Sequence, residues 1–156
     1  MSALPKPGDP APDFEASTTD GKRVALKDFR GKKLVMYFYP KDDTPGCTKQ
    51  ACSLRDHNKE IKAKGAEILG VSTQGEKSHQ EFTKKYNLNF PLLADTGGNV
   101  GRAYGTLGGG GLVSKLKSAA GMADRVTFII DEKGRIAHVI DRPDVANHAD
   151  EVLRLL

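Results

Sequence analysis

The chain alternates short, strongly apolar runs with segments in which apolar residues recur at helical spacing. Two of the runs, Leu34–Tyr39 and Glu67–Val71, consist mainly of aliphatic and aromatic side chains. Central strands that are covered on both faces have this composition. A third run, Phe90–Ala94, contains Pro91, which favours the edge of a sheet or an irregular strand. The pattern therefore predicts a sheet with buried inner strands.

Helical periodicity fills the intervals between these runs. From Gly46 to Lys64 the apolar residues are spaced by 4, 3 and 7 positions, and Gly65 is a stop signal. Ser78–Tyr86 has the pattern of a short surface helix, and Asn99–Tyr104 predicts a short helical segment. Val145–Leu156 has the spacing of an amphipathic C-terminal helix.

Two hairpins complete the predicted elements. Phe14–Thr18 and Arg23–Leu26 flank an Asp-Gly pair, which is a strong turn signal. Arg125–Asp131 and Arg135–Ile140 flank a turn that ends in glycine. Strands that alternate with helices, followed by a hairpin and a helix, predict an α/β fold with a central mixed sheet. The length and the lack of a linker or repeat predict one domain over residues 1–156.

Composition narrows the function classes. The chain is 38% hydrophobic and 28% charged, which is typical of a soluble globular protein. Neither a membrane span nor a secretory signal is visible, so we expect a cytoplasmic protein without a membrane partner. The net charge of +4 comes from 24 basic residues scattered among 20 acidic ones, so we expect no nucleic-acid partner. In a reducing compartment, two cysteines are typical of catalysis or redox sensing.

Both cysteines lie in Tyr37–Arg55, where an apolar strand leads through a polar turn into a helix. Cys47 follows Thr44-Pro45-Gly46, in which Thr44 is a candidate N-cap, proline suits the first helical position and Gly46 lets a ligand approach the backbone. A helix N-terminus favours the thiolate, which is the nucleophilic form of cysteine. The alternative is that Cys47 packs as a small hydrophobic residue.

Cys52 lies five residues after Cys47. In an unbroken helix their Cα atoms would be roughly 8.7 Å apart, whereas a disulfide needs about 7 Å or less. If a disulfide joins the two cysteines, the first helical turns must unwind. The alternative is that Cys52 is an inert core residue on the face of Ala51 and Leu54.

This stretch resembles the peroxiredoxins, most closely the bacterioferritin-comigratory or Q-type subfamily. Residues 40–48, PKDDTPGCT, match the family signature P-x-x-x-T-x-x-C, and residues 51–56 match the subfamily's resolving-cysteine segment. Further matches span most of the chain, at Gly70–Ser72, Ser78–Phe82, Lys85-Tyr86, Phe90–Leu93 and Arg125–Asp131. The resemblance implies a thioredoxin-like fold, a thiol peroxidase activity on hydrogen peroxide and organic hydroperoxides, and no metal or organic cofactor.

The resemblance also implies a reaction sequence and its partners. Cys47 would be the peroxidatic cysteine, which attacks the peroxide and becomes a sulfenic acid. Cys52 would resolve it as an intramolecular disulfide, and thioredoxin or a glutaredoxin-like dithiol would restore both thiols. From the subfamily we expect a monomer that serves antioxidant defence.

Four further residues receive roles in the peroxide pocket. Arg125 would hold the thiolate and the peroxide oxygens with its fixed donors. The Thr44 hydroxyl would bridge sulfur and peroxide. Pro40 would wall the pocket, and the backbone N–H groups of Gly46 and Cys47 would bind the far oxygen.

The sequence departs from the family pattern in two places. Gln50 stands where the family usually carries Glu, so we expect the Arg125 charge to be less neutralised and the Cys47 thiolate to be more favoured. Gly105–Asp124 is longer and more glycine-rich than the usual segment; we expect a flexible pocket rim there rather than a phosphate loop.

The remaining polar residues carry no assigned chemistry. We expect His79 to be exposed on its helix, and Asp42 and Asp43 to be solvated. The histidines are too widely spaced for a zinc site. Two rival functions are a general disulfide oxidoreductase, which the spacing of the cysteines disfavours, and a redox sensor whose oxidised helix exposes a partner surface.

Overall fold

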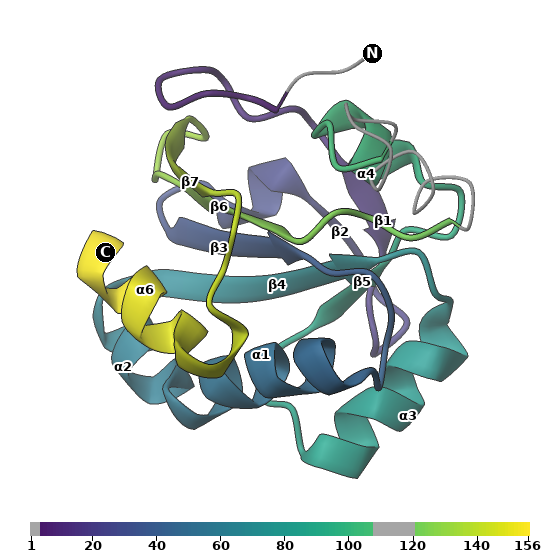
Figure 1. Cartoon of the computed structure of the whole chain (residues 1–156). Coiled ribbons are helices and arrows are strands. Elements are labelled where there is room, and N and C mark those ends of the chain that lie inside the picture. Colours follow the sequence, from purple (N-terminus) through teal and green to yellow (C-terminus); the bar gives the residue numbers. More distant parts are fainter. Residues whose placement is uncertain (1–3, 108–120) are drawn as a thin grey trace.

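The computed structural model describes residues 4–107 and 121–156, which fold around a five-stranded mixed sheet of order β5-β4-β3-β6-β7 (Figure 1). A separate two-stranded hairpin, β1-β2, lies beside it. In chain order the elements are β1 (Glu15–Ser17), β2 (Arg23–Ala25), η1 (Leu26–Phe29), β3 (Lys33–Phe38), α1 (Pro45–Asp56), α2 (Asn58–Ala63), β4 (Ala66–Ser72), α3 (Glu76–Tyr86), β5 (Leu92–Ala94), α4 (Asn99–Ala103), β6 (Val126–Ile130), β7 (Ile136–Ile140), η2 (Val145–Asn147) and α6 (His148–Leu155). The predicted α/β fold with a central mixed sheet and an N-terminal hairpin is confirmed.

Strand β3 is the middle strand of the sheet, as its apolar sequence predicted. It pairs in parallel with β4 and antiparallel with β6. Its residues from Leu34 to Phe38 have no exposed surface. Strand β5 lies at the sheet edge, where Pro91 led us to expect it.

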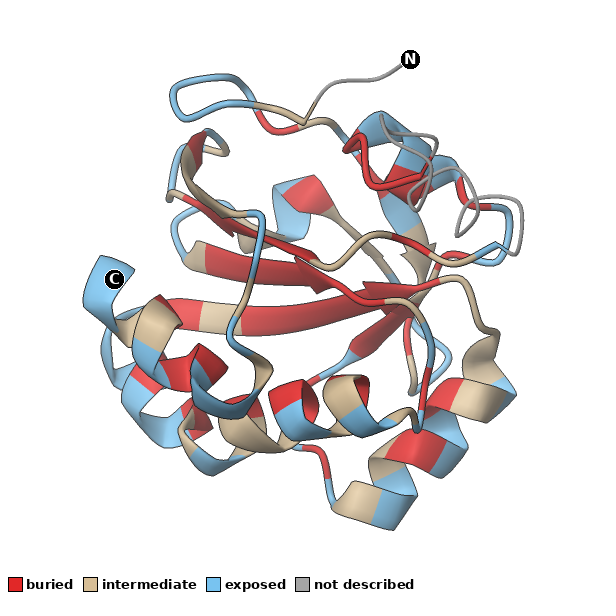
Figure 2. Cartoon of the chain, viewed as in Figure 1, coloured by how far each residue is buried: buried red, intermediate tan, exposed pale blue. Residues whose placement is uncertain are grey.

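The sheet separates two hydrophobic layers, because successive side chains of a strand point to opposite faces. Figure 1 shows α1, α2, α3 and α6 on one face, and the β1-β2 hairpin and α4 on the other. Leu34, Met36 and Phe38 belong to the hairpin layer, whereas Val35, Tyr37 and Tyr39 belong to the layer that contains Cys47. Figure 2 shows the inner strands buried and the outer faces of the helices exposed. The strand alternation therefore directs Tyr37 and Tyr39 toward α1.

The prediction of one helix over Gly46–Lys64 is wrong in one respect. The structure has two helices there, which meet at His57. This residue has φ −115° and ψ 11°, so α1 ends before it and α2 begins after it. Its ring atom Nδ1 lies 3.0 Å from the Ser53 carbonyl oxygen. Asn58 is buried and donates through Nδ2 to the Asn89 carbonyl at 3.0 Å. Such side chain–backbone hydrogen bonds compete with helix continuation.

The other predicted elements are present with small shifts at their ends. The C-terminal helix begins with a 3-10 turn, η2, before α6. Most of the predicted Gly105–Asp124 rim, including its four consecutive glycines, lies outside the described residues. Within residues 4–107 and 121–156, the helices are all too short or too polar to span a membrane.

Candidate active site

Cys47 lies in the first turn of α1, immediately after the loop that leaves β3. Thr44 occupies the N-cap position with extended backbone, and Pro45 is the first helical residue. Cys47 is 1% exposed. The N–H groups of a first helical turn have no partner within the helix and carry partial positive charge. Cys47 therefore lies at the start of a helix, where the sequence placed it.

Arg125 lies 78 residues after Cys47 in the chain and contacts it in the fold. Its Nη2 atom lies 3.2 Å from Cys47 Sγ. The residue immediately precedes β6, and Val126 pairs with Phe38 at the end of β3. This antiparallel register brings Arg125 to the place where the chain turns toward α1.

Gln50 and Gly46 complete the surroundings of the guanidinium. Arg125 Nη1 donates to Gln50 Oε1 at 2.8 Å, so one guanidinium contacts both the amide and the sulfur. Gln50 is fully buried, and its Nε2 has no hydrogen-bond partner among the residues described. A Cβ atom on Gly46 would lie 3.2 Å from Arg125 Nη2. Glycine at this position therefore allows the guanidinium to approach the helix.

Thr44 differs in one detail from the expected N-cap. Its side chain makes no capping hydrogen bond; instead, Oγ1 donates to the Lys41 carbonyl at 2.9 Å. The hydroxyl closes the loop before α1 rather than pairing with a helical N–H. Pro40 is half-buried at the start of the same loop, and its carbonyl accepts a hydrogen bond from Gln74 at 3.5 Å. Neither residue has a hydrogen bond to Cys47 within the described part of the chain.

Cys52 lies on the same uninterrupted helix as Cys47, and both are free thiols. Helix geometry keeps their Cα atoms roughly 8.7 Å apart. Cys52 is half-buried, whereas Ala51 and Leu54 are completely buried. Cys52 thus lies beside the core face of α1 rather than within it.

The sequence-based expectations that Asp42 and His79 face solvent are wrong. Asp42 is 7% exposed and His79 is completely buried, although both were expected to face solvent. His79 Nδ1 lies 2.7 Å from Asp42 Oδ2, and Tyr39 and Ser78 donate their hydroxyls to the same carboxylate at 2.6 and 2.7 Å. A buried carboxylate needs such partners, since an unpaired charge in the core is costly. The spacing of His79 three residues before Phe82 was the signal that could have placed it on the core face of α3.

The tyrosines beside the site stay neutral. Burial raises the pKa of Tyr37 and of Tyr39 well above the ordinary value, and nearby Cys47 or Asp42 adds to the shift. Their rings stack with centroids 5.4 Å apart. They therefore contribute packing and polarity near Cys47, not acid–base chemistry near neutral pH.

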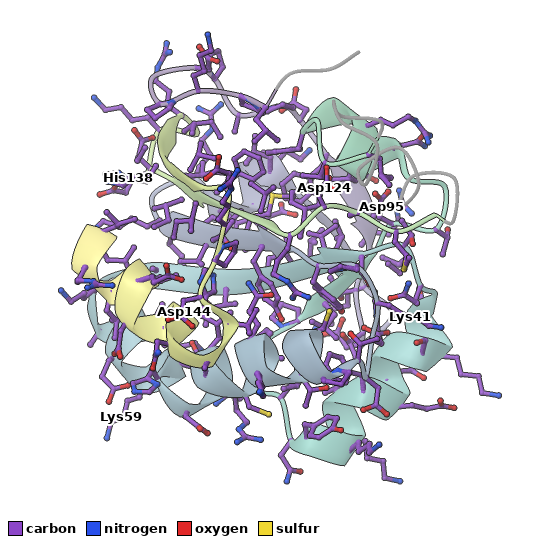
Figure 3. All side chains as sticks on the ribbon, in the orientation of Figure 1. Lys41, Lys59, Asp95, Asp124, His138 and Asp144 are labelled. Atoms are coloured by element: carbon purple, nitrogen blue, oxygen red, sulfur yellow. The ribbon has the colours of Figure 1, made fainter. Side chains whose placement is uncertain are left out.

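The described residues provide no grouping of histidine, cysteine and carboxylate side chains that could hold a metal ion. A hollow of about 450 Å³ lies between the N-terminal hairpin, the start of α3 and α4, and Asp95 lines it. Figure 3 shows Asp95 near α4, and Lys41 in the loop between β3 and α1. None of the predicted site residues lines this hollow.

Comparisons with known proteins identify relatives over most of the chain. The model of the AhpC/TSA family matches residues 7–139. Peroxiredoxin Bcp of Escherichia coli K12 is 42% identical over 151 residues, which are 97% of this chain and 95% of the relative.

Solved structures give the same result. Peroxidoxin BcpB from Mycobacterium tuberculosis superposes with a TM-score of 0.83 and 32% identity, covering 97% of this chain and 96% of that one. A mutant of PrxQ from Xylella fastidiosa superposes with a TM-score of 0.87 and 27% identity, covering 98% and 96%. The fold is thus the thioredoxin-like fold of these neighbours, and the chain belongs to the AhpC/TSA family, among the peroxiredoxins of the Bcp and Q type.

Proposed function

We propose that this chain reduces hydrogen peroxide and organic hydroperoxides at Cys47. The thiolate attacks one peroxide oxygen, the O–O bond breaks, and the other oxygen leaves as hydroxide or alkoxide and takes up a proton. Cys47 becomes a sulfenic acid. The observation that carries this proposal is the 3.2 Å contact between Arg125 Nη2 and Cys47 Sγ at the start of α1.

Arg125 would act on both reacting partners. Its permanent charge favours the thiolate before the reaction and stabilises the charge that grows on the leaving oxygen. The Thr44 hydroxyl donates to the Lys41 carbonyl, and its oxygen would accept the peroxide hydrogen. Pro40 would limit water at the pocket wall, and the N–H groups of Gly46 and Cys47 would bind the far oxygen.

Cys52 would complete the cycle. Its thiol condenses with the Cys47 sulfenic acid, which forms a disulfide and releases water. Because the two Cα atoms are too far apart in the intact helix, the start of α1 must unwind first. A dithiol such as thioredoxin or a glutaredoxin-like protein would then reduce the disulfide by exchange. We expect the chain to act as a monomeric, single-domain antioxidant enzyme of the cytoplasm, with no resident cofactor.

Coupled turnover tests the proposal. Peroxide loss is followed with thioredoxin, its reductase and NADPH for the wild type, Cys47→Ser and Cys52→Ser. We expect turnover in the wild type and none in Cys47→Ser. Cys52→Ser should consume about one peroxide per Cys47 and then stop, since its sulfenic acid cannot be resolved within the chain.

Each rival function predicts a different pattern. A general disulfide oxidoreductase would reduce a protein disulfide in the absence of peroxide, and a redox sensor would show oxidation without turnover. Full coupled turnover in Cys52→Ser would remove Cys52 from the mechanism. No turnover in the wild type would refute the peroxidase assignment.

A further inference from the structure

Helix α3 contacts both ends of the segment that carries the two cysteines. The segment begins after Asp43 and ends at Arg55, and both of these residues bond to Tyr86 at the C-terminal end of α3. The Tyr86 hydroxyl donates to Asp43 Oδ1 at 2.6 Å. Arg55 Nη1 donates to the Tyr86 carbonyl at 2.5 Å. One residue thus spans the two boundaries of the α1 segment.

The upstream boundary has a second exposed contact. Lys85 Nζ lies 2.7 Å from Asp43 Oδ2, and the hydrogen bonds from Lys85 and then Tyr86 lower the pKa of Asp43. Asp43 has φ 58°, a left-handed conformation that only a minority of residue types adopt without strain. The contacts with α3 thus hold the chain in a sharp turn directly before Thr44 and α1.

A buried contact lies beside this turn. His79 and Ser78 of α3 bond to Asp42 at 2.7 Å each. The Asp42 backbone N–H donates to Gln74 Oε1 at 2.9 Å. The upstream end is therefore fixed at two successive residues, one buried and one exposed.

The downstream boundary is also held by groups outside α1. Asn89, which follows α3 in the chain, donates through Nδ2 to the Arg55 carbonyl at 3.1 Å. Ser53 Oγ accepts the backbone N–H of Ala149 at 3.0 Å, which ties the same end of α1 to α6. Between the two boundaries lie Cys47 and Cys52.

We propose that Tyr86 is a positioning residue, which holds the segment between Asp43 and Arg55 in its helical, peroxide-reactive form and thereby slows its unwinding. This inference rests on the proposed Cys47–Cys52 disulfide, because unwinding matters only if that bond forms. The sulfenic acid has two fates: condensation with Cys52, which releases water, or attack on a second peroxide, which gives sulfinic acid. A contact that slows unwinding lengthens the life of the sulfenic acid. Tyr86 therefore sets how much peroxide the chain tolerates before Cys47 is over-oxidised.

The test measures this partition directly. Wild type and variants are mixed with hydrogen peroxide and quenched with an alkylating reagent at successive times. Mass spectrometry then measures the fractions of disulfide and of sulfinic acid. Tyr86→Phe removes the hydroxyl contact and keeps the ring, which packs against Phe82 with centroids 5.5 Å apart. Asp43→Gly removes the acceptor, and glycine tolerates the positive φ. We expect Tyr86→Phe to form the disulfide about five-fold faster, as the loss of one net hydrogen bond implies. Asp43→Gly should be at least as fast, because it also removes the contact with Lys85. Both variants should accumulate less sulfinic acid.

Tyr104→Phe is the matched control. It also loses a tyrosine hydroxyl contact, from Tyr104 to the Pro12 carbonyl at 2.7 Å, but on the other face of the sheet. We expect its ratio of disulfide to sulfinic acid to equal that of the wild type. The double variant Asp43→Gly/Tyr86→Phe should differ little from Asp43→Gly, because Asp43→Gly already removes the contact that Tyr86→Phe removes.

The outcomes separate the two proposals. If the wild type forms the disulfide and both variants keep its rate and its sulfinic acid yield, the positioning role of Tyr86 is refuted and the peroxidase proposal stands. A wild type that never forms the Cys47–Cys52 disulfide refutes both. An equal shift in Tyr104→Phe would assign the effect to general loss of stability and refute the positioning role.

Discussion

At the scale of single residues, one guanidinium connects the Cys47 sulfur to Gln50, the residue that departs from the family pattern. Arg125 contacts Cys47 through Nη2 and Gln50 through Nη1. A neutral amide leaves the positive charge of Arg125 free to act on the sulfur, whereas a carboxylate at the same place would neutralise part of it.

Gln50→Glu tests this arrangement. We expect a smaller fraction of Cys47 thiolate at a given pH and a several-fold slower reaction with peroxide, because the carboxylate competes for the guanidinium and repels the thiolate. Thiolate absorbance against pH and stopped-flow kinetics measure the two effects. Lys49→Gln is the control, since it changes the net charge equally at an exposed position of α1. An equal or larger thiolate fraction in Gln50→Glu would contradict the expectation.

At the scale of elements, one buried histidine connects α6 to the sheet. His148 Nε2 lies 2.8 Å from Thr127 Oγ1 of β6, and its Nδ1 lies 3.0 Å from Glu151 Oε1. Burial is the main influence and lowers the pKa of His148; Glu151 and Asp144 oppose this and Arg125 adds to it. The docking of α6 on α1 and β6 thus favours a neutral imidazole.

Because the pKa of His148 is lowered in the folded state, the free energy of unfolding should fall as the solution is acidified. The folded state holds a proton on this ring less tightly than the unfolded state, so the unfolded state binds more protons on acidification. The stabilisation is complete above the unfolded pKa of about 6.5 and is lost as pH falls through the lower, folded pKa. Urea unfolding of the wild type and His148→Gln across this range measures it. We expect a steeper loss of stability on acidification in the wild type; parallel curves would contradict the assignment.

At the scale of the whole molecule, the proposed conformational change involves the first turns of α1, on one face of the sheet. Both faces of the sheet are covered by helices or by the hairpin, and the pairing of β3 with β4 and β6 does not involve the first turns of α1 (Figure 1). Unwinding breaks helical hydrogen bonds such as that from Thr48 N–H to the Thr44 carbonyl, at 2.8 Å. The sheet therefore provides a fixed base for a local change.

Hydrogen exchange of the reduced and the disulfide forms checks this expectation. Amides in the first turns of α1 should exchange faster after oxidation, while those of β3 and β6 keep their protection, because local opening needs less free energy than global unfolding. Cys52→Ser treated with the same peroxide is the control and should keep the protection of α1. Loss of protection throughout the sheet would show that the change is global.

The sequence by itself determined the inner strands, the hairpins and the place of Cys47 at a helix start. These features depend on neighbouring residues: the apolar run of β3, the Asp-Gly turn, and the proline and glycine before the cysteine. Arg125 is different, because spacing along the chain does not relate it to Cys47. The resemblance to peroxiredoxins predicted its place, and the structure explains that place by the pairing of Phe38 with Val126.

Only the tertiary structure decided the division of the predicted helix at His57 and the burial of Asp42 and His79. Helical spacing shows which residues share one face of a helix. It does not show which polar groups of other elements will pack against that face. Asn58 meets Asn89, and Asp42 meets His79, across 31 and 37 residues of chain. Asn58, Asp42 and His79 are buried, and each has a hydrogen-bond partner far away in the chain. Such pairs form only when the elements pack against one another.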